Sequence, residues 1–271
     1  MFKCGITGST SVMGKFLIRN LPLKFFKFEG RVENKRKIKK WIDSNHFDLI
    51  IHLAAIVPTE RVNKNYKKAL RVNYLGTKNI VDCINKSKNK PFWFFFSSTS
   101  HVYGAKGKKN IIEKQKLYPY SKYGYTKFLA ENYIKKNLKI DYTIARIFSF
   151  TEKKQLINFL IPSLVNKIKR KEKTIANLNH FRDFIHIKDI CSAINILWNK
   201  RAKGIFNIGS GKKIYLKNLA MIIDNEINKK NTIKFKDNDK PTYLIANIQK
   251  LKNLGWKPKY GINKIVKDYL N

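Results

Sequence analysis

Two Tyr-x-x-x-Lys pairs overlap in one short segment, Tyr118/Lys122 and Tyr123/Lys127. A tyrosine that exchanges a proton near neutral pH needs its pKa lowered from about 10 toward 7, and a nearby ammonium group does this by stabilising the phenolate. Pro119 disfavours helical dihedral angles at Tyr118, so the first pair would straddle a helix start. Tyr123 and Lys127 would lie inside the helix, one turn apart on the same face. This spacing favours Tyr123 and Lys127 as an acid/base pair beside a hydride carrier. The alternative is a surface helix with a chance spacing, because both residue types are abundant.

A second feature is the sequence Gly-Ile-Thr-Gly-Ser-Thr-Ser-Val-Met-Gly at residues 5–14. Gly8 and Gly14 flank a predicted turn between the first strand and the first helix. Glycine lets the backbone approach a pyrophosphate closely, and the helix N-terminus supplies unpaired N–H groups. Ser11 replaces the usual middle glycine, so the dinucleotide fingerprint is imperfect.

The same fingerprint needs an acidic residue near the end of the second strand to bind the ribose 2′-hydroxyl. Glu29 is in a suitable place and favours NAD. Arg31, two residues later, could instead meet a 2′-phosphate and favour NADP. We expect NAD, with NADP as the alternative.

The third feature is a cluster of hydroxyl groups in the sequence Phe-Phe-Phe-Ser-Ser-Thr-Ser-His-Val-Tyr-Gly at residues 94–104. A predicted buried strand ends in this cluster, at the carboxyl edge where parallel sheets place their ligands. Hydroxyl groups there can bond a substrate oxygen, although serine and threonine are also common where strands lead into loops.

These motifs need elements to position them, and the sequence predicts an α/β fold. Apolar strands alternate with amphipathic helices through the first half, which indicates a Rossmann-type, doubly wound parallel sheet covered on both faces. The predicted strands are Phe2–Thr7, Lys24–Phe28, Leu49–Leu53, Phe92–Ser97 and Tyr142–Arg146, and the helices are Met13–Leu21, Lys35–Ser44, Tyr66–Lys86 and Ser121–Lys136. Residues 1–150 form the predicted dinucleotide-binding domain. Residues 151–271 form a smaller α/β substrate lobe, some of which packs back on the first domain.

The predicted elements of the second half are shorter and less regular. They are helices over Leu156–Arg170, Ile187–Asn199, Leu216–Asn228 and Ile262–Leu270, and strands over Asp183–His186 and Ile205–Ile208.

Length and composition fit a globular protein. The chain has 271 residues, and its hydrophobic content of 43% is ordinary. Its apolar runs are much shorter than a membrane span, and the first residues already enter a predicted strand, so neither a span nor a signal peptide is expected. Cys4, Cys83 and Cys191 are few and far apart. This suits a reducing compartment such as the cytoplasm and argues against a disulfide framework or a metal site.

The formal net charge of +39 has two interpretations. It could attract a polyanion such as nucleic acid, or a phosphorylated substrate. It could also reflect a compositional bias, because Lys, Asn, Ile, Phe and Tyr are all abundant. The lysines are spread from end to end, which favours the bias, and nucleic acid is not an expected partner.

Taken together, the motifs resemble those of the extended short-chain dehydrogenases/reductases, in the nucleotide-sugar epimerase/dehydratase group. The resemblance covers residues 3–269. Besides the three features above, it rests on Asp-Leu-Ile-Ile-His-Leu-Ala-Ala at 48–55, Val-Asn-Tyr-Leu-Gly-Thr-Lys-Asn at 72–79, Arg-Ile-Phe-Ser at 146–149, Arg-Asp-Phe-Ile-His-Ile-Lys-Asp at 182–189, Phe-Asn-Ile-Gly-Ser-Gly at 206–211 and Leu-Gly-Trp-Lys-Pro at 254–258. Single motifs are degenerate, but this set in the family's order is specific.

The resemblance implies roles for individual residues. Tyr123 would be the acid/base, Lys127 would bind the nicotinamide ribose and lower the pKa of Tyr123, and Thr99 would bond the substrate oxygen. The implied cofactor-binding residues are Gly8, Ser11, Val12, Met13, Gly14, Glu29, Arg31, Leu53, Ala54, Ala55, Asn73, Ser97, Tyr123, Lys127 and Phe148. The implied substrate-binding residues are Thr99, Ser149, Arg182 and Lys240, with Arg182 meeting the pyrophosphate of the nucleotide sugar.

Departures from the family pattern narrow the expected reaction. Ser100 and His101 stand where the 4,6-dehydratases carry Asp-Glu, so a dehydratase is not expected. His101 could be a second acid/base, or it could simply satisfy a backbone carbonyl. Ser149 and Lys240 also differ from common family residues, which leaves the sugar open.

The stretch before Asp48 is shorter than the family usually has, as if one strand–helix unit of the cofactor half were missing. We therefore expect an NAD(P)-dependent nucleotide-sugar epimerase or 4-ketoreductase. Its oligomeric state is open, and a homodimer is the candidate. The alternative is an impaired scaffold that binds RNA or another polyanion.

Overall fold

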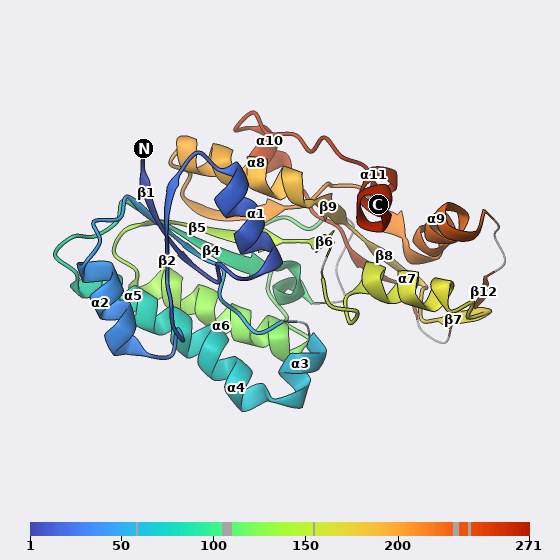
Figure 1. Ribbon diagram of the computed structural model, residues 1–271, viewed down its shortest axis with the longest axis horizontal. Helices are drawn as coiled ribbons and strands as arrows, with labels where there is room; N and C mark the ends of the chain where they lie inside the picture. The colour runs from blue at the N-terminus through green and yellow to red at the C-terminus, as the bar shows by residue number, and fades with distance from the viewer. Residues whose placement is uncertain (58, 105–109, 154, 230–232, 238–239) are drawn as a thin grey trace. The chain divides into compact units, whose positions relative to one another are not determined.

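The computed structural model describes residues 1–57, 59–104, 110–153, 155–229, 233–237 and 240–271. The chain divides into two compact units, whose elements are drawn in Figure 1. The first contains Met1–Gly104, Lys116–Ile147 and Cys191–Phe206, and the second contains Ala105–Gln115, Phe148–Ile190 and Asn207–Asn271.

The first unit is built on a six-stranded sheet with the order β10-β5-β4-β3-β1-β2. Its strands are β1 (Lys3–Thr7), β2 (Lys24–Lys27), β3 (Leu49–His52), β4 (Trp93–Thr99), β5 (Asp141–Ile147) and β10 (Gly204–Ile208). Neighbouring strands from β2 to β5 pair in parallel. The predicted Rossmann-type α/β fold is therefore confirmed, and all five strands expected in the first half are present with ends shifted by one or two residues.

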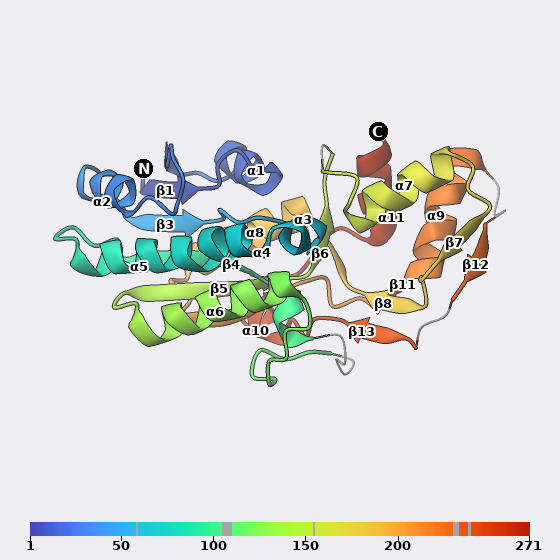
Figure 2. The same cartoon turned by 90° about the horizontal axis from the view of Figure 1, so that it is seen from below.

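Alternating side chains of β4 pack on opposite faces of this sheet. Phe94 and Phe96 belong to a buried cluster that also takes residues from helices α2 (Lys35–Asp43), α5 (Gly76–Lys86) and α6 (Lys122–Asn137). Trp93 instead contacts Trp198 of α8 (Ile187–Asn199), with 5.7 Å between the ring centroids. The period-two pattern of the strand thus buries large rings on both faces, as expected for a covered parallel sheet. Figure 2 shows α5 and α6 running beside the strands.

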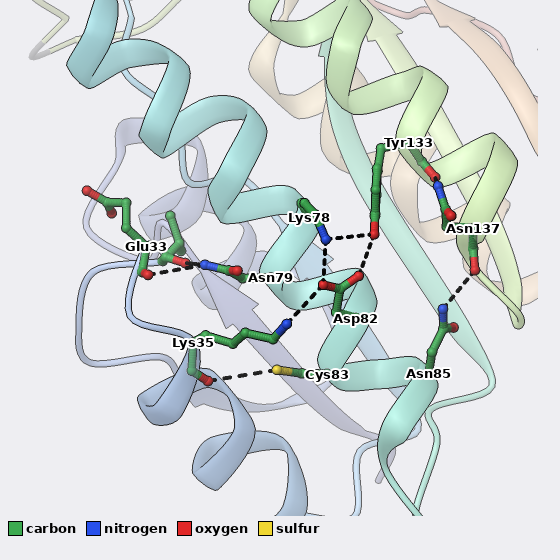
Figure 3. Close-up of polar contacts among 10 residues, drawn as sticks. Glu33, Lys35, Lys78, Asn79, Asp82, Cys83, Asn85, Tyr133 and Asn137 are labelled. Atoms are coloured by element: carbon green, nitrogen blue, oxygen red, sulfur yellow. Dashed lines mark hydrogen bonds and ion pairs between the residues drawn. The ribbon is translucent and has the colours of Figure 1, made fainter.

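A polar cluster joins α2, α5 and α6, the helices that pack on the Phe94 and Phe96 face of the sheet (Figure 3). The Asp82 carboxylate on α5 accepts hydrogen bonds from Lys78 Nζ (2.8 Å), Lys35 Nζ (3.0 Å) and Tyr133 Oη (2.5 Å). Lys35 lies on α2 and Tyr133 on α6. These charge-assisted bonds lower the pKa of Asp82 to about 2 against the opposing effect of burial. The Asp82 carboxylate therefore links the three helices on this face of the sheet.

The predicted helix Tyr66–Lys86 is interrupted by a wider turn. It consists of α4 (Tyr66–Leu70), a π-helical turn (Arg71–Leu75) and α5. A π-turn inserts one residue into the helical repeat, which hydrophobic periodicity does not reveal. The other helices of this unit are α1 (Val12–Asn20), α3 (Thr59–Lys64) and a 3-10 turn (Ser100–Tyr103).

The second unit contains three small sheets and four helices among the described residues. The helices lying wholly within it are α7 (Leu160–Lys169), α9 (Leu216–Asn228), α10 (Gln249–Lys252) and α11 (Ile262–Leu270). The strands are β6 (Ser149–Thr151), β7 (Thr174–Ala176), β8 (His180–Arg182), β9 (Phe184–His186), β11 (Ile214–Tyr215), β12 (Lys234–Lys236) and β13 (Thr242–Leu244). Apolar residues of α7, α9 and α11 form its core with Ile175 and Phe184.

Helix α7 begins at Leu160, whereas the prediction began it at Leu156. Starting at Leu160 puts Pro162 in the first turn, where its missing N–H costs no hydrogen bond. A helix starting at Leu156 would have placed Pro162 in its interior. Helices α8, α9 and α11 have the predicted bounds.

Candidate active site

The predicted reactive residues of the first unit gather where parallel strands end. Strand β1 ends at Thr7, β3 at His52 and β4 at Thr99, and the strands pair side by side. Because the carboxyl ends of parallel strands share one edge, Gly8, Leu53 and Thr99 lie at the same edge of the sheet.

The turn between β1 and α1 is closely packed. Gly8 has a φ of 73°, and a side chain there would meet the backbone nitrogen of Ala54 at 2.7 Å. At Gly14, a side chain would collide with the carbonyl oxygen of Gly8. Both positions therefore require glycine, as the phosphate-loop hypothesis expects.

Ser11 is the N-cap of α1. Its Oγ accepts a hydrogen bond from the Gly14 N–H (3.0 Å) and donates one to the Gly8 carbonyl (2.7 Å). The serine that replaces the middle glycine thus closes the turn and begins the helix. Its exposed helix N-terminus fits a pyrophosphate, since the first N–H groups of a helix attract anions. Glu29 and Arg31 are both exposed just after β2.

Thr99 and Tyr123 come together in the first unit. Tyr123 lies in the first turn of α6, and its hydroxyl forms a hydrogen bond with the Thr99 hydroxyl. Lys127 follows one turn later on the same helix, so the register inside the helix is confirmed, whereas Tyr118 precedes it and is exposed.

Burial raises the pKa of Tyr123 to about 12, and the bond from Thr99 lowers it only in part. The direction is opposite to the lowering by Lys127 that the sequence suggested. Although the Tyr123 ring is partly exposed, its hydroxyl end lies among protein atoms, and desolvation there disfavours the phenolate. The neutral phenol is therefore the stable form of Tyr123 in this structure.

Lys127 is almost completely buried, with 2% of its surface exposed. Burial lowers the pKa of Lys127 to about 7, and the nearby Glu131 carboxylate opposes this. The ammonium nitrogen lies 4.1 Å from the centroid of the Phe96 ring, a contact that favours the charged form. Lys127 can therefore change its charge near neutral pH.

Glu131 forms a buried ion pair with Arg146 of β5. The Arg146 Nη2–Glu131 Oε2 distance is 2.7 Å, and Arg146 Nε lies 3.1 and 3.2 Å from the two carboxylate oxygens. Ser98 Oγ donates to the same carboxylate at 2.5 Å, and Arg146 Nη1 donates to Tyr103 Oη at 3.0 Å. This network satisfies both charges and fixes Glu131 one turn beyond Lys127.

His101 lies in the 3-10 turn after β4. Its ring stacks on Tyr120, with centroids 5.6 Å apart, and packs edge-to-face with the Tyr123 ring, with centroids 5.7 Å apart. Its Nδ1 is 3.4 Å from Ser121 Oγ. Gly124 makes this proximity possible, because a side chain at that position would meet the His101 carbonyl oxygen at 2.6 Å. The structure thus brings His101 beside Tyr123.

Asn73, in the π-turn, holds the segment that follows β3. Its Oδ1 accepts from the Ile56 N–H (2.7 Å), and its Nδ2 donates to the Ile56 carbonyl (3.2 Å) and to Thr126 Oγ1 (3.0 Å). Asn73 therefore links the segment after β3, through Ile56, to Thr126 of α6.

The predicted substrate residues Ser149, Arg182 and Lys240 all belong to the second unit, as does Phe148. Ser149 begins β6, Phe148 is buried, and Lys240 is exposed. The Arg182 guanidinium donates to the Phe181 carbonyl (2.8 Å) and to the carbonyl and hydroxyl oxygens of Thr242 (3.1 and 3.0 Å).

Asp183, which the sequence did not single out, follows Arg182 and binds two other segments of the second unit. Its buried carboxylate accepts hydrogen bonds from Ser210 N (2.7 Å), Ser210 Oγ (2.6 Å), Gly211 N (2.9 Å) and Ala246 N (3.1 Å).

Comparison with known proteins identifies the family of the chain. The family described as GDP-mannose 4,6 dehydratase matches residues 18–269. The chain belongs to this family. It is an enzyme of the extended short-chain dehydrogenase/reductase type, a class that uses NAD(P), as the sequence predicted.

Relatives in this family carry several activities. The GDP-6-deoxy-D-talose 4-dehydrogenase of Aggregatibacter actinomycetemcomitans is 31% identical over 72% of this chain and 69% of its own length. The dTDP-4-dehydro-6-deoxyglucose reductase of Escherichia coli is 27% identical over 97% of this chain and 96% of its own length. The family therefore includes reductases and dehydrogenases of nucleotide sugars.

Solved structures confirm the fold. RMD from Pseudomonas aeruginosa, solved with NADPH, has a TM-score of 0.87 at 20% identity and covers 100% of this chain and 98% of its own. The UDP-glucose 4-epimerase of Thermotoga maritima, solved with UDP-glucose, has a TM-score of 0.85 at 20% identity and covers 99% of this chain and 97% of its own. Among the described residues, no helix combines the length and the apolar character that a membrane crossing requires.

Proposed function

We propose that the protein is an NAD(P)-dependent nucleotide-sugar epimerase or 4-ketoreductase, with Thr99, Tyr123 and Lys127 as its reactive set. The observation that carries this proposal is the hydrogen bond between Thr99 and Tyr123 at the end of β4, with Lys127 one turn further along α6. An oxygen bound beside both hydroxyl groups would be held and supplied with a proton at the same place.

A neutral Tyr123 suits the proton donation that ketone reduction needs. When bound, NAD(P)H supplies a hydride to the carbonyl carbon of a keto-sugar. Tyr123, held neutral by burial, donates its proton to the carbonyl oxygen while Thr99 orients that oxygen. Epimerisation needs the reverse transfer first, in which Tyr123 accepts the proton of a sugar hydroxyl. A protonated Lys127 assists that step by stabilising the phenolate.

His101 is the candidate for a second acid/base, which neither ketone reduction nor the hydride-based epimerisation above requires. Its ring lies against Tyr123, where a second acid/base would act on a carbon next to the carbonyl. We expect His101→Gln to lose epimerisation at that carbon and to keep simple ketone reduction. Equal loss of both activities would refute this role. Ser100 and His101 also stand in place of the acidic pair of the dehydratases, so we do not propose dehydration.

The choice of cofactor rests on the residues after β2. Glu29 supports NAD, because an acidic side chain accepts hydrogen bonds from the ribose 2′-hydroxyl and repels a 2′-phosphate. The sheet ends with β2 next to β1. We therefore propose that one strand–helix unit, on the side that would bind adenosine, is missing. We further propose that the protein binds its cofactor less tightly than family members that have this unit.

The first experiment is a fluorescence titration of the purified protein with NADH and, separately, with NADPH. Binding at micromolar concentrations supports the proposal, and the preferred form decides between Glu29 and Arg31. If neither form binds up to millimolar concentrations, the redox proposal is wrong.

A pair of tyrosine variants then tests the reactive set. Tyr123→Phe should keep the affinity for NADH within about twofold and lose hydride transfer to keto-sugar nucleotides by roughly a hundredfold or more, since it removes the proton donor. Tyr125→Phe is the matched control, because this exposed tyrosine lies on the same helix. Equal activity of the two variants would exclude Tyr123 as the acid/base.

The alternative of a polyanion-binding scaffold is not favoured by the relatives, which are enzymes. We also propose that the chain works in a reducing compartment such as the cytoplasm, because Cys4, Cys83 and Cys191 are free and buried. A homodimer remains a proposal to be tested by sedimentation.

A further inference from the structure

His52 is a buried histidine at the end of β3 that the proposed reaction does not use. Its exposed fraction is 1%, and its ring lies between Thr7 of β1 and Thr77 of α5. The Thr7 Oγ1–His52 Nδ1 distance is 2.6 Å and the Thr77 Oγ1–His52 Nε2 distance is 2.9 Å. Aromatic rings of β4 complete its surroundings, with Phe96 5.7 Å away. Both ring nitrogens are therefore used inside the protein.

The direction of each hydrogen bond follows from counting protons. Thr77 has one hydroxyl proton and donates it to the Asn73 carbonyl at 2.8 Å, so its oxygen accepts from His52 Nε2–H. A neutral imidazole with its proton on Nε2 has a bare Nδ1, which accepts the Thr7 proton. The Thr7 oxygen in turn faces the Ala54 N–H at 3.4 Å.

The same chain of bonds continues to the catalytic helix. Asn73, whose carbonyl is held by Thr77, binds both backbone groups of Ile56 and donates to Thr126 Oγ1. Thr126 donates its own proton to the Tyr123 carbonyl at 2.8 Å. An unbroken series of hydrogen bonds thus runs from β1 through His52 to the first turn of α6.

The π-turn Arg71–Leu75 lies on this connection. Asn73 lies at its centre, and Thr77 bonds the carbonyl four residues before it, a contact that helical threonines often make. Wider turns of this kind are frequent at functional sites because they reorient one residue within a helix. Asn73, which holds the segment after β3, lies in this turn.

From this geometry we propose that His52 is a positioning residue. As a neutral imidazole protonated on Nε2, it fixes Asn73, and through Asn73 it sets the cofactor wall formed by residues 53–56 relative to Tyr123. The inference rests on the proposed function, because it assigns that wall to NAD(P). Burial, helped by the positive charge of Lys127, lowers the pKa of His52 well below its usual value, so the required neutral form persists.

Substitutions at His52 separate positioning from packing. Gln can accept from Thr7 with Oε1 and donate to Thr77 with Nε2, whereas Phe fills the space without either bond. His52→Phe should weaken NADH binding by about tenfold or more, and His52→Gln should restore most of it. Thr77→Val breaks the same series elsewhere, and its effect on NADH affinity should not add to that of His52→Phe.

Thr143→Val is the matched control for simple destabilisation. Thr143 is completely buried, and its hydroxyl donates to the Ala202 carbonyl at 2.5 Å within the same unit, away from the wall. It should lower the thermal midpoint and leave the NADH dissociation constant unchanged. A single fluorescence titration series with NADH, together with thermal melts, gives both quantities for all variants.

The outcomes distinguish the positioning role of His52 from the proposed function. If the wild-type protein binds neither NADH nor NADPH, the proposed function fails. If it binds NADH and both His52→Phe and Thr77→Val bind equally well, the positioning role is wrong and the proposed function stands. If His52→Phe does not fold, the NADH affinities of the other three variants decide. Thr77→Val should weaken NADH binding, whereas His52→Gln and Thr143→Val should leave it nearly unchanged.

Discussion

Replacing Lys127 by methionine should make the protein more stable at neutral pH while removing its activity. Lys127 is 2% exposed, and burial lowers its pKa from 10.5 to about 7. A lysine that binds its proton less tightly in the folded than in the unfolded state destabilises the fold. The destabilisation is fully present below the folded pKa and disappears above the unfolded one. Stability contributed by this group therefore rises as the pH rises from about 7 toward 10.5.

The size of the effect follows from the two pKa values. The penalty is roughly 4 kcal/mol at pH 7, about 2 kcal/mol at pH 9 and less than about 0.5 kcal/mol at pH 10.5. Methionine has a similar length, carries no charge and keeps a favourable contact with the Phe96 ring. Lys127→Met should therefore remove most of this penalty, so its advantage over the wild type should shrink steadily as the pH rises.

Urea denaturation followed by tryptophan fluorescence measures this difference at several pH values. The control is Lys135→Met, an exposed lysine on the same helix, which should change stability by less than about 0.5 kcal/mol at every pH. Because all other lysines titrate in both proteins, the difference between variant and wild type isolates Lys127. A stability difference that does not depend on pH between 7 and 10 would refute the reasoning. So would a Lys127→Met protein that is less stable at pH 7.

Substitutions at three further places test other parts of the structure by the same denaturation assay. Glu131→Gln leaves the buried Arg146 without its counter-ion and should cost about 3–5 kcal/mol, and adding Arg146→Met should recover part of this loss; an additive double variant would contradict the ion pair. Gly104→Ala forces a side chain into a φ of 82° and against the Tyr118 carbonyl, so it should cost at least about 1–3 kcal/mol; a neutral effect would be inconsistent with this turn. Ser11→Ala removes the cap of α1 and should cost about 1 kcal/mol, whereas Ser11→Gly should cost only a few tenths; equal losses would argue against the capping bond.

The sequence predicted the elements in which local pattern and tertiary environment agree. The strands of the main sheet are continuous apolar runs, because both of their faces are covered. Helix α6 was placed correctly because Pro119 and Ser121 mark its start. With its start known, the Tyr/Lys pair that lies inside the helix followed without any knowledge of packing.

Other features depend on contacts that no local pattern contains. Most strands of the second unit have only two or three residues, too few for a period of two to be recognised. The π-turn around Asn73 is indistinguishable from an ordinary helix in sequence. The direction of the Tyr123 pKa shift required knowing that burial outweighs the hydrogen bond with Thr99. His52 carried a weak signal, a histidine at the end of an apolar strand, but its two threonine partners lie 45 and 25 residues away.

The buried face of α6 is itself an argument for function. Its buried residues include Gly124, Lys127 and Glu131, at positions where a helix packed on a sheet normally places apolar side chains. Burying a lysine and a glutamate costs stability, and Arg146 and Ser98 offset only the charge of Glu131. Local rules of this kind are usually broken where a reaction requires it. In the proposed function, the helix carries this destabilising polar stripe because Tyr123 and Lys127 act at the end of β4, which is also why Lys127→Met should gain stability at the expense of activity.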